Sequence, residues 1–94
     1  MMADSKDFLI EQLTNNLEIL RAGAKLTQEA TAKAIGISRQ TYCQIENGNA
    51  KMSWSVYLSL LLLFSSIPGT ADLLRKLGIR VEEIMNDLNE QIRS

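Results

Sequence analysis

The sequence lacks several residues on which enzymes and secreted proteins depend: it has no histidine, a single cysteine and a single proline among 94 residues. Histidine is the commonest general base and metal ligand, and without an imidazole the thiol of Cys43 has no usual activator. A glycine-rich phosphate loop is also missing. We therefore expect no catalytic residue, no cofactor and no metal site. A lone cysteine excludes an internal disulfide and, with no signal peptide, predicts a cytoplasmic protein.

Net charge and long apolar runs are also limited. The formal net charge is −1, but residues 17–51 carry five basic and three acidic residues, a local charge of +2. So modest a charge predicts few phosphate contacts and a shallow salt dependence for any nucleic-acid binding.

The apolar run from Trp54 to Phe64 is shorter than the roughly 20 residues that a transmembrane helix needs, so we expect a buried helix and no membrane partner.

Aliphatic residues are abundant by contrast. Hydrophobic residues make up 46% of the chain and glycines are few, a composition typical of one soluble, all-α domain. Apolar residues recur at helical spacing over residues 7–22, which predicts a first helix. Ser53 can cap a central helix, and the break at residues 65–69 ends it.

Signals at helix boundaries mark residues 27–48 as two short helices joined by a tight turn. Thr27 offers a side-chain oxygen to the first backbone donors of one helix. Gly36 ends that helix, because glycine adopts a left-handed backbone conformation at the least cost. Ser38 can then cap a second helix that reaches about residue 46. The pattern is that of a helix-turn-helix motif.

The second helix of this motif has two different faces at about 100° per residue. Its outward arc contains Arg39, Gln40, Cys43, Gln44 and Asn47, whereas Tyr42 and Ile45 point toward the core. Guanidinium and primary amide groups pair bidentately with guanine and adenine edges in the DNA major groove. The alternative is a polar face that is merely solvated, but the tight-turn context favours DNA. Cys43 on this arc is expected to be a small neutral contact.

These residues resemble a known family. The resemblance is carried by Arg21, Gln28-Glu29, Ala32, Ile35 to Ser38 and Ile45 to Gly48. They are similar to the Cro and lambda-repressor-type helix-turn-helix family, the XRE-like transcriptional regulators, from about Leu17 to Phe64. The resemblance implies a compact five-helix DNA-binding domain that acts as a dimer on a two-fold operator. Thr31 and Met52 depart from the family pattern, and Thr31 is expected to loosen the packing beneath the motif.

The resemblance also implies roles for individual residues. The helix of residues 38–46 would read bases through Arg39, Gln40 and Gln44, with Thr41 against a thymine methyl group. Phosphates would be bound by Thr27, Gln28, Ser38, Asn47 and Lys51. Arg21 and Glu46 would form an ion pair that locks the first helix to the reading helix, the alternative being that both are solvated.

The second half of the chain is divided at residue 69. We expect residues 1–69 to form the helix-turn-helix domain and residues 70–94 a helical extension, with Thr70 as a cap. Five apolar residues of the extension share one helical stripe: Val81, Ile84, Met85, Leu88 and Ile92. This stripe either packs on its own domain or forms a dimer interface.

The leading hypothesis is a sequence-specific DNA-binding transcriptional regulator, a homodimeric repressor that binds a double-stranded operator. The alternative is an antitoxin or protein-interaction module whose C-terminal extension binds a partner protein such as a toxin. The nearly uncharged central helix and the amphipathic tail motivate this alternative.

Overall fold

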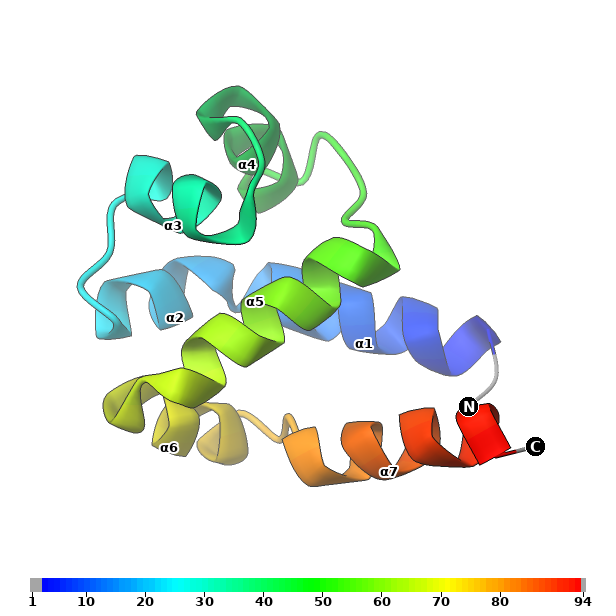
Figure 1. Ribbon diagram of the computed structural model, residues 1–94. Coiled ribbons are helices and arrows are strands. Elements are labelled where there is room, and N and C mark those ends of the chain that lie inside the picture. The colour runs from blue at the N-terminus through cyan, green and yellow to red at the C-terminus, as the bar shows by residue number, and fades with distance from the viewer. Residues whose placement is uncertain (1–2, 94) are drawn as a thin grey trace.

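The computed structural model describes residues 3–93 and contains only α-helices within that range (Figure 1). The helices are α1 Ala3–Asn15, α2 Leu17–Gly23, α3 Gln28–Ile35, α4 Arg39–Glu46, α5 Trp54–Ser66, α6 Pro68–Lys76 and α7 Val81–Arg93. The predicted all-α class with a helical C-terminal extension is therefore confirmed.

The expected first helix is in fact two helices separated by Asn16. The backbone of Asn16 has φ −114° and ψ 6°, outside the helical range, and its side-chain amide donates to the carbonyl of Gln12 at 2.8 Å. Asparagine competes for backbone hydrogen bonds in this way, which breaks the helix although the apolar pattern continues. Leu13 and Leu17, on either side of the break, are both fully buried.

The predicted caps of the motif and of the central helix are present. The hydroxyls of Thr27, Ser38 and Ser53 accept hydrogen bonds from the backbone N–H groups of Ala30, Thr41 and Val56, at 3.0, 3.0 and 3.2 Å. Gly36 ends α3 with φ 79°, the left-handed conformation that its position requires. The local sequence thus fixes where α3, α4 and α5 begin.

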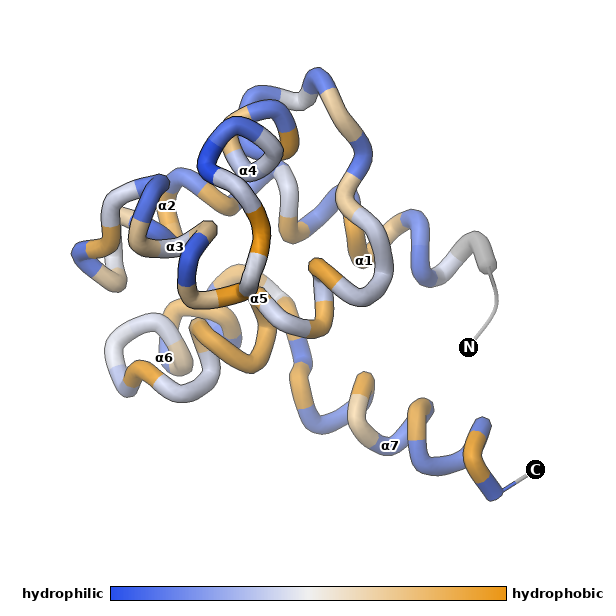
Figure 2. The backbone as a smooth tube through the Cα atoms, turned by 45° about the horizontal axis from the view of Figure 1, so that its top comes forward, coloured by the Kyte–Doolittle hydropathy of each residue, from blue (hydrophilic) through white to orange (hydrophobic). Residues whose placement is uncertain are grey.

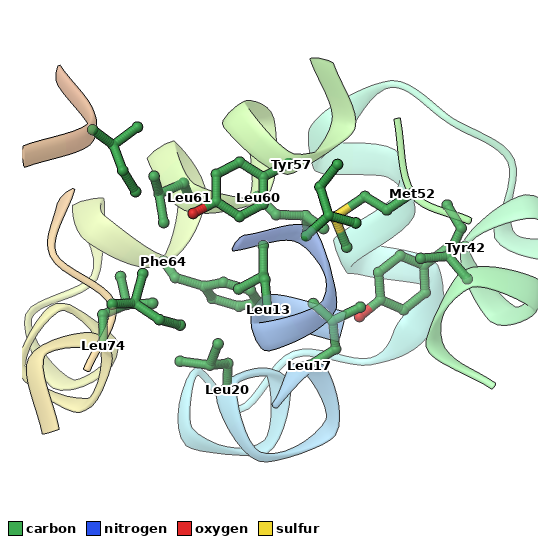
Figure 3. Close-up of a cluster of buried hydrophobic side chains, with 14 of the residues drawn as sticks. Leu13, Leu17, Leu20, Tyr42, Met52, Tyr57, Leu60, Leu61, Phe64 and Leu74 are labelled. Carbon is green, nitrogen blue, oxygen red and sulfur yellow. The ribbon is translucent and has the colours of Figure 1, made fainter. Parts of the chain in front are cut away.

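The central helix α5 holds the fold together. Its Tyr57, Leu60 and Phe64 are fully buried, and α1, α3 and α6 pack around it. Figure 3 shows side chains from α1, α2, α4, α5 and α6 gathered in one cluster, with Leu13 near its middle. Burial of apolar surface in such a cluster supplies most of the favourable folding free energy.

The helix α6 begins earlier than expected, and Thr70 is not its cap. Pro68 occupies the first turn, where its fixed φ suits a helix and its missing N–H costs nothing. Thr70 is instead fully buried, and its hydroxyl donates to the carbonyl of Phe64 at 2.8 Å. The expectation of a Thr70 cap was wrong because the proline determines the start of the helix.

The helix α7 packs partly on the core of its own chain. Ile84 is 3% exposed and joins the same core as Leu74 of α6, while Val81 and Leu88 are half-buried against that core. Met85 and Ile92 are 57% and 82% exposed. The apolar stripe of α7 is therefore divided: Ile84 lies in the core of the chain, and Met85 and Ile92 remain on the surface.

Within residues 3–93 no single helix has the length and apolar character needed to cross a membrane. The helices α5 and α6 reach that length and composition only when taken together, and they are bent by 117° at their junction.

Candidate nucleic-acid interface

The helix α4 presents the face that the sequence predicts. Tyr42 and Ile45 are buried at 0% and 3% exposure. The four candidate base-reading residues, Arg39, Gln40, Thr41 and Gln44, are all exposed. The view coloured by hydropathy shows polar residues along α4 (Figure 2). In both views α7 lies at the other end of the molecule, so the C-terminal helix does not cover this face.

The side chains of Arg39, Gln40 and Gln44 make no hydrogen bond or ion pair within residues 3–93. Their donors and acceptors are therefore available to another molecule. Thr41 differs, because its hydroxyl accepts a hydrogen bond from the hydroxyl of Ser38 at 2.8 Å. The hydroxyl proton of Thr41 and its methyl group remain available, and the methyl group suits apolar contact with thymine.

The turn between α3 and α4 holds the two helices at close range. The backbone N–H of Ile37 donates to the carbonyl of Ala32 at 3.0 Å, and the backbone N–H of Gly36 donates to the carbonyl of Lys33 at 3.2 Å. Ala32 is fully buried, and its small side chain allows the helices to approach. Thr31 beside it is also fully buried, and its hydroxyl donates to the carbonyl of Thr27 at 2.8 Å. The polar group of this atypical core residue is thus satisfied.

Arg21 and Glu46 form a bidentate ion pair beneath the motif. The Nε and Nη2 atoms of Arg21 donate to Oε1 and Oε2 of Glu46 at 3.0 and 3.2 Å. The two side chains are 20% and 7% exposed. A third donor of the guanidinium reaches the carbonyl of Leu26 at 3.1 Å. This arrangement ties α2, the loop before α3 and the end of α4 together.

Glu46 collects further donors from α3 and α4. The Tyr42 hydroxyl donates to its Oε1 and the Gln28 amide to its Oε2, both at 2.8 Å. Burial raises the pKa of Glu46, but the hydrogen bonds from Arg21, Tyr42 and Gln28 outweigh it, and the pKa lies below its usual value. Burial, followed by the bond to Glu46, raises the pKa of the Tyr42 hydroxyl well above its usual range. Glu46 is therefore ionised and Tyr42 neutral at physiological pH.

Gln28, a predicted phosphate ligand, takes part in this network. Its Nε2 donates to Glu46, and its Oε1 accepts from the Cys43 thiol at 3.2 Å. Cys43 is accordingly half-buried and turned toward α3. The expectation that Cys43 lies on the outward arc was wrong, because a wheel angle does not include the position of the neighbouring helix.

The side chains of the remaining phosphate candidates differ in whether they already have partners within the chain. Asn47 is exposed, and the hydroxyls of Thr27 and Ser38 already serve as helix caps. The Lys51 ammonium lies 2.7 Å from Oδ1 of Asp7, and both side chains are more than 60% exposed. An ion pair so exposed is worth little and exchanges readily for another anion.

The sequence did not indicate the Tyr42 hydroxyl as part of the site, although the i,i+4 spacing of Tyr42 and Glu46 is a signal that was available. The sequence also did not indicate that the ring of Trp54 stacks on that of Tyr57, with ring centroids 4.8 Å apart. The Lys6 ammonium lies 5.3 Å from the Trp54 ring.

Within residues 3–93 no three Cys, Asp or Glu side chains gather where they could hold a metal ion.

The fold and this face define the protein as a helix-turn-helix DNA-binding protein. The family model of a helix-turn-helix domain matches residues 12–64, which is more than half of the chain. That family lies in the Cro and lambda-repressor-like group, and the chain belongs to it. No curated protein and no solved structure matches the chain.

Proposed function

We propose that the protein is a sequence-specific transcriptional regulator of the cytoplasm that acts as a homodimeric repressor on a double-stranded DNA operator. The supporting observation is the division of α4 into two faces. Tyr42 and Ile45 anchor the helix in the core, and three side chains without partners face outward. We assign the protein no catalytic role.

Base recognition is assigned to the outward face of α4. Arg39 offers the bidentate donor that suits the O6 and N7 atoms of guanine. Gln40 and Gln44 offer the amides that suit N6 and N7 of adenine. Thr41 adds apolar contact for a thymine methyl group. These chemistries give each operator half-site a defined sequence.

Phosphate binding supplies orientation in this proposal, with modest affinity. Lys51 and Asn47 follow α4, and Thr27 and Ser38 begin α3 and α4, where backbone donors favour anions. With a formal net charge of −1, the protein cannot rely on general attraction to DNA. Affinity must therefore come from base contacts and from the combination of two subunits.

Dimerisation is assigned to the surface of α7 that the subunit leaves uncovered. Met85 and Ile92 are exposed apolar side chains on that helix. Because α7 lies away from α4, pairing through α7 leaves the reading face open (Figure 1). To bind one duplex, the two-fold axis of this dimer must leave both copies of α4 facing the same side.

The same exposed side chains favour a second candidate, an antitoxin or protein-interaction module. In that case Met85 and Ile92 bind a different protein, such as a toxin, and the helix-turn-helix domain either retains DNA binding or serves as a scaffold. The two candidates differ in whether the isolated chain selects a DNA sequence.

Selection of bound duplexes from a random pool, combined with sedimentation of the free protein, tests the proposal. The regulator predicts a two-fold consensus with half-site centres about one helical turn apart, or a multiple of it, and a dimer in solution. No enrichment at low salt would contradict DNA reading and favour the partner module. A consensus without two-fold symmetry would contradict the dimer.

A further inference from the structure

Polar side chains without partners flank the exposed apolar residues of α7. At about 100° per residue, Glu82, Asn89 and Arg93 lie within about 80° of Met85, on the side away from the core. All three side chains are exposed, and none makes a hydrogen bond or ion pair within residues 3–93. Met85 and Ile92 are 57% and 82% exposed. One face of α7 therefore has an apolar centre and a polar flank without partners in that part of the chain.

The two charges on this flank stand at opposite ends of the helix. Glu82 lies in the first turn of α7 and Arg93 in the last turn. The remaining acidic residues of α7 lie on its far side, at least about 140° from Met85. In a parallel pair of α7 helices each flanking charge would meet its own like charge, whereas in an antiparallel pair Glu82 would meet the partner's Arg93. The charge pattern is therefore complementary to itself in the antiparallel orientation only.

The same orientation aligns the apolar residues. With Met85 of one copy opposite Ile92 of the other, Glu82 and the partner's Arg93 are offset by about 3 Å along the helix axis. The long arginine side chain spans that offset. Asn89 then lies next to the two-fold axis and close to its own copy, and a carboxamide can both donate and accept there. Apolar, ionic and amide contacts therefore agree on one register.

The position of the apolar face around α7 sets the direction of the two-fold axis. Ile84 is buried in the core of its own chain, and Met85 and Ile92 lie about 80 to 100° from it around the helix. A second α7 on this face therefore lies beside the chain and not beneath it. The axis of an antiparallel pair is perpendicular to both helices and to the line between them, so it runs from α7 through the core.

This axis suits the position of α4. In Figure 1, α4 lies across the molecule from α7, with the core between them. A two-fold axis that runs from α7 through the core leaves both copies of α4 on the same side of the dimer. The axis of a parallel pair runs along α7 instead and turns the two copies of α4 to opposite sides, where one duplex cannot meet both.

We propose that α7 pairs in antiparallel orientation with α7 of a second copy of the chain, through Met85 and Ile92, with Glu82 of each copy bonded to the partner's Arg93. This inference rests on the proposed function, which assigns dimerisation to α7, and it adds the orientation, the register and the residues that specify them. The apolar contact is small, so we expect the free dimer to form only at high protein concentration.

Charge reversal in the full chain tests the orientation. Sedimentation equilibrium at low salt gives the dissociation constant of the dimer. Glu82→Arg and Arg93→Glu should each raise it about tenfold, because two attractive contacts per dimer become repulsive. Both substitutions in one chain should restore it to within about threefold of the wild-type value. Glu90→Arg, the same reversal on the far side of α7, should leave it unchanged. A parallel pair predicts no loss for either single substitution, and that result overturns the inference.

Cross-linking tests the register independently. In a Cys43→Ser background, Asn89→Cys places the only thiol next to the proposed axis, and Glu82→Cys places it at the start of α7. A short bis-maleimide should link the Asn89→Cys chains into dimers. The two thiols of Glu82→Cys lie about 20 Å apart along the antiparallel helices, so these chains should stay unlinked. Linkage of Glu82→Cys, or no linkage of Asn89→Cys, overturns the inference.

The apolar contact has a matched pair of variants. Ile92→Ser should raise the dissociation constant by more than about tenfold, whereas Ile19→Ser, the same change at a 54% exposed isoleucine of α2, should leave it unchanged. Thermal melting checks that both are folded. Equal dimerisation of the two variants overturns the inference, as does a wild-type chain that stays monomeric at its highest soluble concentration.

Failure of this inference can be distinguished from failure of the proposed function. Selection of an operator sequence by a chain that fails the charge-reversal or cross-linking test overturns the antiparallel pair and leaves DNA reading by α4 intact. A dimer that passes both tests but selects no DNA sequence supports the pair and contradicts the regulator.

Discussion

Replacing Arg21 with methionine removes the guanidinium while keeping most of the side-chain volume, and it leaves Glu46 ionised beneath the motif. Loss of one partner of a buried ion pair costs about 3 to 5 kcal/mol when burial is complete. Here Arg21 is 20% exposed, and Glu46 keeps the hydrogen bonds from Tyr42 and Gln28. We therefore expect a loss of about 2 to 3 kcal/mol in the free energy of unfolding, just below the range for complete burial.

For a domain of this size that loss corresponds to a melting temperature lower by about 10 to 20 °C. Circular dichroism at the helical band follows the transition. Arg75→Met is a matched control, because the side chains of Arg75 and Asp72 form an ion pair but are 76% and 48% exposed. Exposed pairs contribute little, so this control should melt close to the wild-type temperature. Equal destabilisation by the two substitutions would refute the structural role of the buried pair.

The pH dependence of this loss has a defined sign. The pKa of Glu46 is lowered in the folded protein, because the hydrogen bonds outweigh burial. Its contribution is therefore fully present above the unfolded carboxyl pKa of about 4.3, and it disappears as the pH falls through the folded pKa. The difference in unfolding free energy between wild type and Arg21→Met should accordingly shrink below about pH 4. A difference that grows on acidification would contradict this assignment.

Three further substitutions test other parts of the molecule. Gln40→Ala should weaken operator binding by about 1 to 3 kcal/mol and relax one position of each half-site in a selection experiment. Asp7→Asn frees Lys51 and should steepen the slope of log affinity against log salt by about 0.9 per subunit, whereas Glu90→Gln, an equal change of charge on α7, should not. Tyr57→Phe should raise the melting temperature, because the buried hydroxyl has no partner within residues 3–93 and burial raises its pKa to about 12.

Local signals in the sequence were sufficient to predict the helix-turn-helix motif. Thr27, Gly36 and Ser38 act on neighbouring backbone groups, so their effects can be read without knowing the tertiary structure. The division of α4 into buried and exposed faces follows in the same way from helical periodicity. The all-α class required only composition and these patterns.

The predictions that failed depend on competition or on distant contacts. At Asn16 a side chain competes with the helix, and at Pro68 a fixed φ determines the helix start in place of a hydroxyl cap at Thr70. The contact of Cys43 with Gln28 depends on how α3 and α4 cross, which periodicity within one helix does not determine. These features need the packed structure.

The burial of Ile84 is a similar case. The apolar stripe that contains Ile84 could pack on its own domain or on a second copy of the chain. The sequence offered no means of choosing between the two. The structure places Ile84 in the core beside residues of α6 and leaves Met85 and Ile92 exposed. The packing of α7 against the rest of the core decided the outcome.

The most direct test of DNA reading by α4 is a change of base preference at one residue. Arg39→Gln replaces a guanidinium suited to guanine with an amide suited to adenine. Selection from a random pool with both proteins should show one G·C pair of each half-site replaced by A·T, with the rest of the consensus unchanged. Weaker binding to an unaltered consensus would contradict the assignment of Arg39, and with it the claim that this face of α4 reads the operator.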